Sequence, residues 1–577
     1  MCTLGPSTDD INVLRSLMLE GMDVARINFS HGTYEEHLKR IEAVKKLRAE
    51  LGLPVALLLD TKGPEIRIGR FEKGPVELKE GETFTLTLNE CRGDNCRVFV
   101  STPQLADNLK PGTDILLDDG LIRLSVEKIQ GPDIICRVLV GGVLSDNKGI
   151  NVPGVRLHMP YLSQKDIDDI KFGIENGFDF IAASFVRRAD DLFDVLRVLE
   201  ENGGSKIKVI AKIENSEGVE NLDDIIKTAD GVMVARGDMG VEIPFEELPR
   251  IQKLIIKKTY MAGKICITAT QMLDSMIKNP RPTRAEATDV ANAIYDGTSA
   301  LMLSGETAVG KYPVESLKTM CKIALKTEAD INYKKRFLNL ETEKLPNVTD
   351  AISHATCSTA HSLQAAAIVT VTKTGKTARF ISRYRPQTPI IGCTTDEIVY
   401  RQLSLSWGVK PVMANEMANT DDLFEHAMDL AMNTGIVKLG DIVVLTAGVP
   451  LGVSGTTNII KVHVVGNVLV KGQGITQKTV IGKLCVCNSE EEALIRFSDG
   501  DILVIPETSN NVMKILKKAG GIITEKGGTA SHAATVGLLL DIPVICGAES
   551  ATKILKNGTV VTVDAAHGLV YNGETKI

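Results

Sequence analysis

The chain has 577 residues, enough for about three or four domains of ordinary size. Its formal net charge of -7 gives no basic surface for nucleic acid, and the most apolar stretch, 536–547, is broken by Asp541 and Pro543, so we expect no membrane span. The eleven cysteines are dispersed without a CxxC pair, which argues against a zinc site or a disulfide scaffold and favours a cytoplasmic location. The N-terminus lacks a charged region and an apolar run, so we also expect no signal peptide.

One pattern recurs eight times before about residue 325: a short apolar strand ends in polar residues, and a helix follows. The predicted strands are 1–5, 24–30, 55–60, 178–186, 208–215, 231–238, 264–270 and 299–306. Strands that alternate with amphipathic helices indicate an α/β fold with a parallel sheet. Eight such units predict a closed (β/α)₈ TIM barrel over residues 1–68 and 157–330, with the reactive groups at the carboxyl ends of its strands.

Residues 69–156 interrupt the third unit with a different pattern. Segments such as FTLTL and ILLDDGLIRLSV alternate or carry β-branched residues, which predicts a small antiparallel β-barrel domain. Because it is inserted in a loop of the barrel, we expect it to close over the barrel mouth as a lid. The DDG at 118–120 is interpreted as a hairpin turn rather than a site.

A second series of strands and helices follows a charged helix and linker at 331–345. Its predicted strands are 365–372, 389–395, 409–414, 440–448 and 458–465. They indicate a separate open α/β domain over residues 346–468. A further linker leads to a last domain of short strands and helices, residues 475–577.

Polar residues gather at the predicted carboxyl ends of the barrel strands. They are Arg26, Asn28, Ser30, Asp60, Thr61, Ser184, Lys212, Glu214, Arg236, Asp238, Thr268, Thr270, Ser304 and Glu306. Any one of them is more often structural than catalytic, but a closed barrel brings all of them to one mouth. There, Glu214 and Asp238 on adjacent strands would form an oxygen site suited to Mg²⁺. Lys212 and Arg26 would hold an anionic substrate and stabilise a developing enolate or a transferring phosphoryl group.

Several longer motifs resemble the pyruvate kinase family, in order from residue 2 to about 465. They are ARINFSHG (25–32), DTKGPEIR (60–67), KGINVPG (148–154), AKIEN (211–215), VARGDMGVEIP (234–244), TATQMLDSM (268–276), RPTRAEATDVANA (281–293) and MLSGETAVGKYP (302–313). The resemblance implies a glycolytic enzyme that transfers the phosphoryl group of phosphoenolpyruvate to ADP, giving pyruvate and ATP. It also implies a homotetramer.

The resemblance assigns roles to matching positions of this chain. Glu214 and Asp238 would bind the divalent metal, Mg²⁺ or Mn²⁺, and the segment from Gly237 to Asp238 would touch the substrate. Lys212 would steady the phosphoryl group and the enolate, and Arg26 would hold the substrate phosphate. These assignments agree with the chemistry, since phosphoryl transfer depends on positioning and charge neutralisation.

Protonation of the enolate and binding of the nucleotide involve further residues. Thr270 matches a threonine near the enolate carbon, and a water relayed by Thr270 and Ser304 is a plausible proton route. Arg67 and Lys148, at the two hinges of the inserted domain, match nucleotide-phosphate contacts. The remaining nucleotide-binding candidates are His31 and Asn28.

A monovalent cation site is also implied by the resemblance. Asn28, Ser30, Asp60 and Thr61 match its ligands. Glu65 is the glutamate of potassium-dependent members of the family, while other members have lysine there. The sequence therefore predicts dependence on K⁺.

The segment TKTGKT (372–377) lies between a strand and a helix of the open α/β domain. It is not a Walker loop, because the required first glycine would fall on Thr370. Hydroxyls, backbone amides and a lysine at a helix start still favour a phosphate, so we expect a phosphorylated small-molecule effector here, with a plain glycine turn as the alternative. The effector residues would be Thr372, Thr374, Gly375, Lys376 and Thr377, and residues 446–458 are a candidate second wall of the pocket.

The tail segment 522–547 resembles the swivelling phosphohistidine domain of phosphoenolpyruvate-utilising enzymes, with His532 in the histidine position. Ala530 replaces the threonine of the usual Thr-Ser-His, and nothing in the chain resembles an ATP-grasp domain that would load the histidine. A structural or regulatory tail is therefore favoured over an active phosphohistidine.

Two other functions remain open at this point. A Mg²⁺-dependent lyase or aldolase could also stabilise a pyruvate enolate with Lys, Glu and Asp, although it would need no nucleotide clamp at Arg67 and Lys148. A catalytically inactive phosphate-sensing protein is the third alternative, and the intact set of Lys212, Glu214 and Asp238 argues against it.

Overall fold

The computed structural model describes the chain except for residues 103, 157–158, 339–346, 418, 450–456, 467 and 575–577. The chain divides into two compact units. The first consists of Met1–His354, Thr370–Glu416 and Gly448–Thr457, and the second of Ala355–Val369, Met417–Ala447 and Asn458–Ile577.

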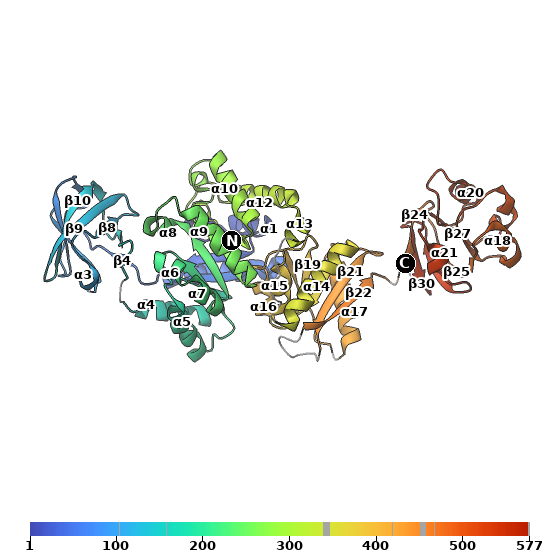
Figure 1. The fold of residues 1–577 in the computed structure, drawn as a ribbon, viewed down its shortest axis with the longest axis horizontal. Coiled ribbons are helices and arrows are strands. Elements are labelled where there is room, and N and C mark those ends of the chain that lie inside the picture. Colours follow the sequence, from blue (N-terminus) through green and yellow to red (C-terminus); the bar gives the residue numbers. More distant parts are fainter. Residues whose placement is uncertain are drawn as a thin grey trace. The chain divides into compact units, whose positions relative to one another are not determined.

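The sheet that dominates the first unit has eight parallel strands in the order β1-β2-β3-β13-β14-β15-β16-β17 (Figure 1). They are β1 (Cys2–Thr3), β2 (Val24–Asn28), β3 (Ala56–Asp60), β13 (Phe180–Ala183), β14 (Lys208–Ile213), β15 (Gly231–Ala235), β16 (Ile265–Ala269) and β17 (Ala300–Leu301). A parallel bridge pairs Cys2 with Leu303, so β1 meets the chain just after β17. The predicted (β/α)₈ barrel is confirmed, and every strand lies inside its predicted range.

Helices cover the outside of this barrel. They are α1 (Ile11–Leu19), α2 (Tyr34–Leu51), α4 (Gln164–Glu175), α5 (Ala189–Glu201), α6 (Ser216–Glu220), α7 (Leu222–Thr228), α8 (Arg236–Glu242), α9 (Leu248–Met261), α10 (Arg284–Asp296), α11 (Gly305–Ala308) and α12 (Pro313–Asp330). Helices α2, α4 and α10 begin at capping boxes, in which the hydroxyls of Thr33, Ser163 and Thr283 accept from backbone amides of the first turn. Short 3₁₀ helices lie at Pro6–Thr8 and Asp274–Ile277.

Alternation along the strands decides which side chains reach the barrel interior. Leu58 on β3 belongs to the interior cluster, whereas Leu57 and Leu59 pack against the outer helices. Because successive side chains point to opposite faces, Asp60 continues the inward row of Leu58. Lys212 likewise continues the inward row of Ile210 on β14. The apolar interior therefore ends in charged side chains at the carboxyl end of the barrel.

The inserted domain contains a seven-stranded sheet in the order β4-β12-β8-β9-β10-β6-β7 and a separate pair, β11-β5. Its strands are β4 (Ile66–Arg67), β5 (Val76–Leu78), β6 (Thr83–Thr87), β7 (Arg97–Phe99), β8 (Asp114–Leu117), β9 (Ile122–Gln130), β10 (Asp133–Val140), β11 (Gly142–Leu144) and β12 (Gly149–Asn151), with the short helix α3 (Leu105–Asn108). Leu117 pairs with Ile122, which confirms the hairpin turn at 118–120. The pair β6 and β7 is parallel, whereas an antiparallel domain was expected.

The two hinges of the insertion are themselves paired. Strand β12 runs antiparallel to β4, with Gly149 opposite Arg67. The chain therefore leaves and re-enters the barrel through two neighbouring strands, and both hinge cations, Arg67 and Lys148, lie in this short ladder.

A five-stranded sheet follows, in the order β20-β19-β18-β21-β22, and its strands β19 and β20 are parallel. Its strands are β18 (Ala367–Val371), β19 (Ile390–Thr394), β20 (Val409–Met413), β21 (Ile442–Gly448) and β22 (Thr457–Val464). The helices of this region are α13 (Tyr333–Leu338), α14 (Val348–Leu363), α15 (Lys376–Ser382), α16 (Glu397–Leu403) and α17 (Thr420–Asn433). All five predicted strands are present. Residues 339–345 of the predicted helix and linker, and most of segment 446–458, lie outside the described residues.

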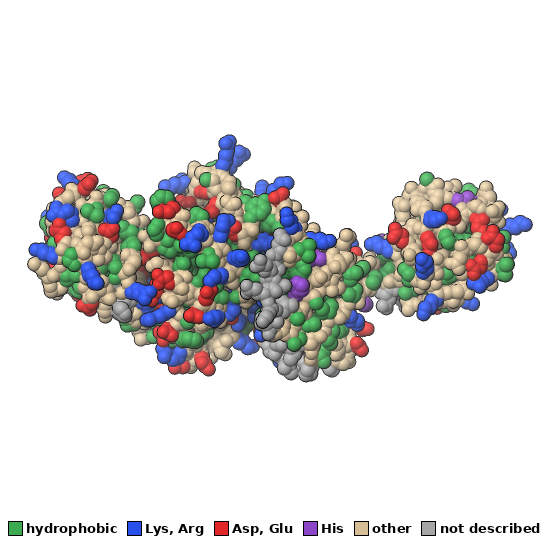
Figure 2. Space-filling model, viewed as in Figure 1, with side chains coloured by type: hydrophobic (Ala, Val, Ile, Leu, Met, Phe, Trp, Pro, Cys, Tyr) green, Lys and Arg blue, Asp and Glu red, His purple; other side chains and the backbone are tan. Residues whose placement is uncertain are grey.

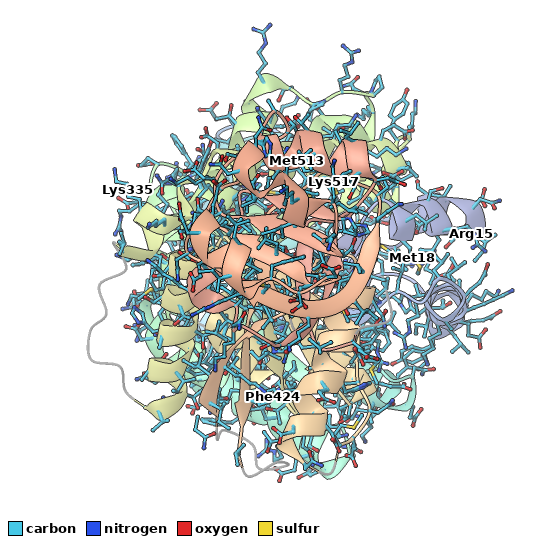
Figure 3. All side chains as sticks on the ribbon, turned by 90° about the vertical axis from the view of Figure 1, so that its right-hand side faces the viewer. Arg15, Met18, Lys335, Phe424, Met513 and Lys517 are labelled. Atoms are coloured by element: carbon cyan, nitrogen blue, oxygen red, sulfur yellow. The ribbon has the colours of Figure 1, made fainter. Side chains whose placement is uncertain are left out.

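The C-terminal region has a sheet in the order β23-β30-β29-β25-β26-β27-β28-β24. Its elements are β23 (Val468–Lys471), β24 (Gln473–Gly474), β25 (Thr479–Val486), α18 (Glu490–Arg496), β26 (Ile502–Ile505), α19 (Met513–Leu516), β27 (Gly521–Thr524), α20 (His532–Leu540), β28 (Val544–Cys546), α21 (Ala551–Ile554), β29 (Val560–Asp564) and β30 (Leu569–Asn572), with a 3₁₀ turn at Asn510–Val512. Figure 3 looks onto this region, with Met513 of α19 toward the viewer. Strands β23 and β24 lie where the sequence predicted a linker, and both pair with strands of the tail.

The surface shows no preference for one sign of charge. In Figure 2, lysine and arginine side chains are interspersed with aspartate and glutamate over the visible face. Among the described helices, none combines the length and the apolar character that a membrane crossing requires. All eleven cysteines carry free thiols, as the absence of a disulfide pattern predicted.

The pairing of β23 and β24 predicts at which residue a chain without the tail should end. Each strand from β23 to β30 pairs only within its own sheet, so a chain ending at residue 466 should fold and keep its steady-state turnover within assay error. A chain ending at residue 474 keeps β23 and β24 without partners, and these exposed strands should promote aggregation. Turnover and light scattering of the two truncations measure the difference. A folded but inactive 466-residue chain would show that the tail takes part in catalysis.

Candidate active site

Asp60 is the centre of a buried charge cluster at the barrel mouth. Its Oδ2 accepts a hydrogen bond from Arg26 Nε at 2.6 Å, and its Oδ1 accepts one from Lys212 Nζ at 3.0 Å. The Ser184 hydroxyl also donates to Oδ1, at 3.1 Å. Burial alone would raise the pKa of Asp60, but the two cations outweigh it and hold that pKa below its ordinary value. Asp60 is therefore ionised and fixes both cations.

Lys212 is held by three partners. Its Nζ donates to the Ser184 hydroxyl at 2.7 Å and lies 3.0 Å from Glu214 Oε1, besides its bond to Asp60. Burial would lower the pKa of Lys212, but Asp60 and Glu214 overcome that effect and raise it above its ordinary value. The ammonium group is consequently charged at neutral pH although it is nearly inaccessible to water.

Glu214 has one carboxylate oxygen without a hydrogen bond. Its Oε2 accepts from the Phe185 amide at 2.5 Å, while Oε1 has no hydrogen-bond partner among the described residues. Burial, together with the negative charges of Asp238 and Asp60, raises the pKa of Glu214 to about 7. Phe185 adopts a φ of 55°, a strained conformation for a bulky residue, in order to present that amide.

These observations fit a divalent cation at Glu214 and Asp238. Oε1 is a buried anionic oxygen whose ion-pair partner in the described chain is the Lys212 ammonium, at 3.0 Å, and Asp238 is close enough to raise the pKa of Glu214 through its charge. Within the described chain, no group of three or more His, Cys, Asp or Glu residues could hold a metal. Two carboxylate ligands suit Mg²⁺, which is typically bound by one or two carboxylates and keeps its other positions for water and phosphate oxygens.

Thr270 sits in a strained loop at the end of β16. Thr270 and Gln271 have φ values of 66° and 52°, although Thr270 is β-branched. The Gly237 amide donates to the Thr270 hydroxyl at 2.8 Å, and that hydroxyl donates to the Ala269 carbonyl at 2.7 Å. Both hydrogen-bonding functions of the hydroxyl are thus engaged with the chain.

Arg236 holds this loop in place. Its guanidinium donates to the carbonyls of Thr270 at 2.6 Å and Gln271 at 3.2 Å, and it forms an ion pair with Asp289 of α10 at 2.6 Å. The sequence indicates Arg236 only as a polar residue at a strand end. The observed contacts identify it as the residue that fixes the strained loop from the neighbouring strand.

The four predicted K⁺ ligands lie at the ends of β2 and β3. Asn28 is in register with Asp60, and its side-chain oxygen accepts from the Ser30 amide at 3.0 Å. The Thr61 hydroxyl accepts from the Ser184 amide at 3.1 Å. The structure therefore brings these residues to one corner of the mouth, where Asp60 is shared with the charge cluster.

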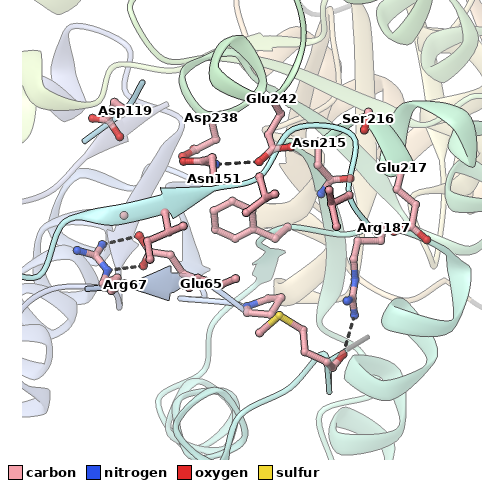
Figure 4. Close-up of a pocket in the computed structure, with 18 of the residues that line it drawn as sticks. Glu65, Arg67, Asp119, Asn151, Arg187, Asn215, Ser216, Glu217, Asp238 and Glu242 are labelled. Carbon is pink, nitrogen blue, oxygen red and sulfur yellow. Dashed lines mark hydrogen bonds and ion pairs between the residues drawn. The ribbon is translucent and has the colours of Figure 1, made fainter. Parts of the chain in front are cut away.

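A cavity of about 370 Å³ lies between the hinges of the inserted domain and the barrel mouth (Figure 4). Its lining includes the predicted residues His31, Arg67, Lys148 and Asp238. Lys212, Glu214 and Thr270 do not line it. The cavity thus joins the nucleotide-binding candidates to one carboxylate of the metal pair.

Carboxylates hold the hinge cations in this cavity. Arg67 Nη2 lies 2.6 Å from Glu65 Oε1, and Lys148 Nζ lies 2.7 Å from Asp118 Oδ1. Across the cavity, the Asn151 amide group donates to Glu242 Oε1 at 3.0 Å, linking the hinge strand β12 to helix α8 (Figure 4). Asp118 falls in the DDG that the sequence indicates as a hairpin turn, and Glu242 lies in helix α8, so sequence reasoning gave neither residue a role at the site; both pairings are tertiary.

The remaining predicted residues have other partners. The Ser304 amide donates to Glu306 Oε2 at 2.7 Å, at the start of α11. In the segment 372–377, Gly375 has a φ of 74°, and the Thr377 hydroxyl lies 2.6 Å from that of Thr457. In the tail, His532 Nδ1 lies 3.0 Å from the Thr508 hydroxyl and Nε2 lies 3.1 Å from Asn510 Oδ1.

A (β/α)₈ barrel whose mouth buries a lysine and an arginine beside carboxylates belongs to a barrel enzyme that acts on an anionic substrate. Three family models match the chain: the barrel domain of pyruvate kinase at residues 1–317, the alpha/beta domain of pyruvate kinase at 350–463, and the mobile domain of PEP-utilising enzymes at 497–568.

Full-length relatives agree. The chain is 51% identical to the pyruvate kinase of Geobacillus stearothermophilus, 48% identical to that of Bacillus licheniformis and 47% identical to that of Sporosarcina psychrophila. Each alignment covers 100% of this chain and 99% of the relative. The chain belongs to the pyruvate kinase family. It is a phosphotransferase that uses phosphoenolpyruvate and ADP, and it depends on a divalent metal.

The pKa of Glu214 predicts how metal affinity varies with pH. Below about pH 7 this carboxyl is mostly protonated, so a divalent cation must displace a proton to bind. The dissociation constant for Mn²⁺ is measured from the signal of free Mn²⁺ in electron paramagnetic resonance. As the pH rises toward 7, this constant should fall by up to about tenfold per pH unit, and above pH 7 it should level off. The variant Glu214→Gln should bind weakly at every pH and show no such step. A constant wild-type affinity from about pH 6 to about pH 8 would contradict the assignment.

Proposed function

We propose that the phosphoryl group moves from phosphoenolpyruvate to ADP at the barrel mouth, beside Lys212. The observation that carries this proposal is the buried ammonium group of Lys212, kept charged by Asp60 and Glu214 at 3.0 Å each. A preorganised cation in a water-poor site acts most strongly where negative charge develops, on the transferring phosphoryl group and the enolate oxygen.

A divalent cation, Mg²⁺ or Mn²⁺, bound by Glu214 and Asp238 would neutralise charge on the substrate oxygens. Arg26 would hold the substrate phosphate with the guanidinium nitrogen that makes no hydrogen bond within the described chain. Its Nε donates to Asp60 and its Nη1 to the Thr3 hydroxyl at 2.8 Å, while Nη2 donates to no described residue. The substrate would thus meet a guanidinium already oriented by the barrel. Gly237 and Asp238 would contact it from the start of α8.

The nucleotide would bind in the cavity beneath the inserted domain. Its phosphates would compete with Glu65 for Arg67 and with Asp118 for Lys148, because each cation is already paired. Until the nucleotide binds, these two carboxylates would keep the hinge cations oriented. His31, which lines the same cavity, and Asn28 would complete the nucleotide contacts.

Protonation of the enolate would involve Thr270 and Ser304 through a water molecule. The Thr270 hydroxyl accepts from Gly237 and donates to Ala269, so it would orient the water rather than lose a proton of its own. Arg236 supports this role by fixing the loop that carries Thr270.

Several finer assignments rest on the family resemblance. A phosphorylated small-molecule effector would bind at the segment 372–377, where Thr372 and Thr377 are buried, Thr374 and Gly375 lie in the bend and Lys376 begins α15. A homotetramer in the cytoplasm, with the domain boundaries predicted above, completes the proposal. His532 has both ring nitrogens within hydrogen-bond distance of a side chain, which supports a structural or regulatory tail.

Removing the ammonium group of Lys212 tests the main proposal. Lys212→Met should lower the turnover number by several orders of magnitude while the thermal midpoint stays near that of the wild type, because the charge is needed chiefly in the transition state. Pyruvate release, coupled to NADH oxidation, measures turnover, and ATP formation separates a kinase from a lyase. Lys208→Met is the matched control, since Lys208 begins the same strand and pairs with Asp230 away from the mouth. Turnover of Lys212→Met within about tenfold of wild type would disprove the role.

Exchange of the monovalent cation tests the predicted K⁺ site. Replacing K⁺ by Na⁺ at equal ionic strength should lower the activity, because the four oxygen-bearing residues and Glu65 are expected to favour K⁺. Glu65→Lys should reduce this dependence, since a fixed ammonium would replace the mobile cation. Equal wild-type rates in the two salts would refute the prediction.

A further inference from the structure

A small cavity lies at the opposite end of the barrel from the active site. It adjoins the amino ends of β16 and β17, where Lys264 precedes β16 and Ser299 precedes β17. Its other wall comes from the segments after β18 and α16. The lining residues are Gly263, Lys264, Ile265, Ser299, Arg379, Ser382, Arg383, Arg385, Ser406 and Trp407. The volume is about 10 Å³, room for one small occupant.

Arg385 brings a buried positive charge to this cavity. Arg385 is 3% exposed. Its Nη groups donate to the carbonyls of Gly297 at 2.8 Å and Ser382 at 3.1 Å and to the Ser299 hydroxyl at 3.0 Å. No carboxylate of the described chain forms an ion pair with it. Burial lowers the pKa of Arg385 to about 9, as expected when the charge lacks a counter-ion. Among the described residues, the guanidinium is compensated by dipoles and by the rings of Trp407, 5.1 Å away, and Tyr260, 5.6 Å away.

The neighbouring cations leave this charge uncompensated. Arg379 donates to the Thr374 carbonyl at 3.2 Å, and Lys264 donates to the Ala229 carbonyl at 2.6 Å. Arg383 is paired with Asp350 at 3.0 Å, but Asp350 does not line the cavity. The lining of this cavity has four cationic side chains and no carboxylate. Buried charges are normally paired, so the set calls for a negative partner.

Two polar atoms in the lining have no partner. Arg385 Nε and the Ser406 hydroxyl are buried, and neither makes a hydrogen bond with any described residue. The Ser406 residue is 7% exposed. A buried donor left without a hydrogen bond destabilises the folded state, so two of them in one cavity indicate an occupant that accepts from both.

We propose that this cavity binds one monovalent inorganic anion of chloride size, held by Arg385 Nε and the Ser406 hydroxyl. A water molecule satisfies the site less well, because it must also donate hydrogen bonds and the lining side chains provide guanidinium, ammonium and hydroxyl donors. An oxyanion such as phosphate exceeds the volume. The bound anion would connect the floor of the barrel to the segments that carry Arg385 and Ser406. The proposal is independent of the chemistry at the barrel mouth.

Trp407 provides a direct measurement, because it is the single tryptophan of the chain and lines the cavity. Sodium bromide should change the emission of the full-length protein along a saturable curve when it replaces sodium gluconate at constant ionic strength. Chloride should compete with this effect. Collisional quenching alone would give a linear dependence without competition, and that result would overturn the proposal.

Three variants localise the effect. Ser406→Ala and Arg385→Gln should raise the half-saturating bromide concentration by about tenfold or more, since each removes a hydrogen bond to a charged ligand. Ser404→Ala is the matched control: this serine lies two residues away, donates to the Pro54 carbonyl at 2.8 Å and does not line the cavity. Equal half-saturation in all four proteins would place the bromide elsewhere and reject the site.

Crystals grown or soaked in bromide give the decisive observation even where Arg385→Gln does not fold. An anomalous peak should lie within hydrogen-bond distance of Arg385 Nε and Ser406 Oγ in the wild type and be absent in Ser406→Ala. A fully occupied water without anomalous signal at that position would show that the cavity is an ordinary hydration site.

Discussion

The pairing of buried charges around Asp60 is the constraint on which the rest of the barrel mouth depends. Two cations, Arg26 and Lys212, and two carboxylates, Asp60 and Glu214, come from three strands and lie within 2.6–3.0 Å of their partners. Taken alone, these four charges balance. Since separating any buried pair would leave an unpaired ion, the three strands are held in one relative position.

Asp238 breaks this balance. Its charge adds to burial in raising the pKa of Glu214 to about 7, so the cluster without a metal carries one carboxylate more than its cations can neutralise. A divalent cation would remove this excess and leave a net positive centre for a phosphorylated substrate. The same argument applies to the two oxygens of Glu214: a backbone amide donates to Oε2, while Oε1 lies 3.0 Å from the Lys212 ammonium and is the oxygen that a divalent cation would bind beside that lysine.

Backbone strain accompanies these charges. Phe185 and Thr270 both adopt positive φ, and in each case a hydrogen bond from or to a neighbouring strand holds the conformation. Such conformations persist only when the surrounding structure fixes them, and Arg236 does so for the Thr270 loop. The strained residues therefore contribute to function by placing an amide and a hydroxyl, while the cost is met by contacts from adjacent strands.

The sequence predicted the barrel and the residues at its mouth because both follow from local pattern. Alternation along a strand places Asp60 on the face of Leu58, and eight repeats bring such strand ends together. The features that escaped prediction depend on tertiary pairing. The positive φ of Phe185 and the bond from Asn151 to Glu242 leave no trace in spacing or composition. The sequence predicts a linker at strands β23 and β24 because each is too short to show a period, and their partners lie more than seventy residues away.

The two ends of the barrel solve the same electrostatic problem differently. At the mouth, the Arg26 guanidinium faces the carboxylate of Asp60, so its charge is compensated before any ligand arrives. At the floor, Arg385 is buried to a similar degree but meets only carbonyls, hydroxyls and aromatic rings. Burial lowers the pKa of Arg385, because the surrounding dipoles stabilise the buried cation without neutralising it. A fold that neutralises the arginine at the barrel mouth within the chain and leaves Arg385 without a counter-ion depends on its solvent for the missing charge, and this places a requirement for a small anion at the opposite end of the barrel.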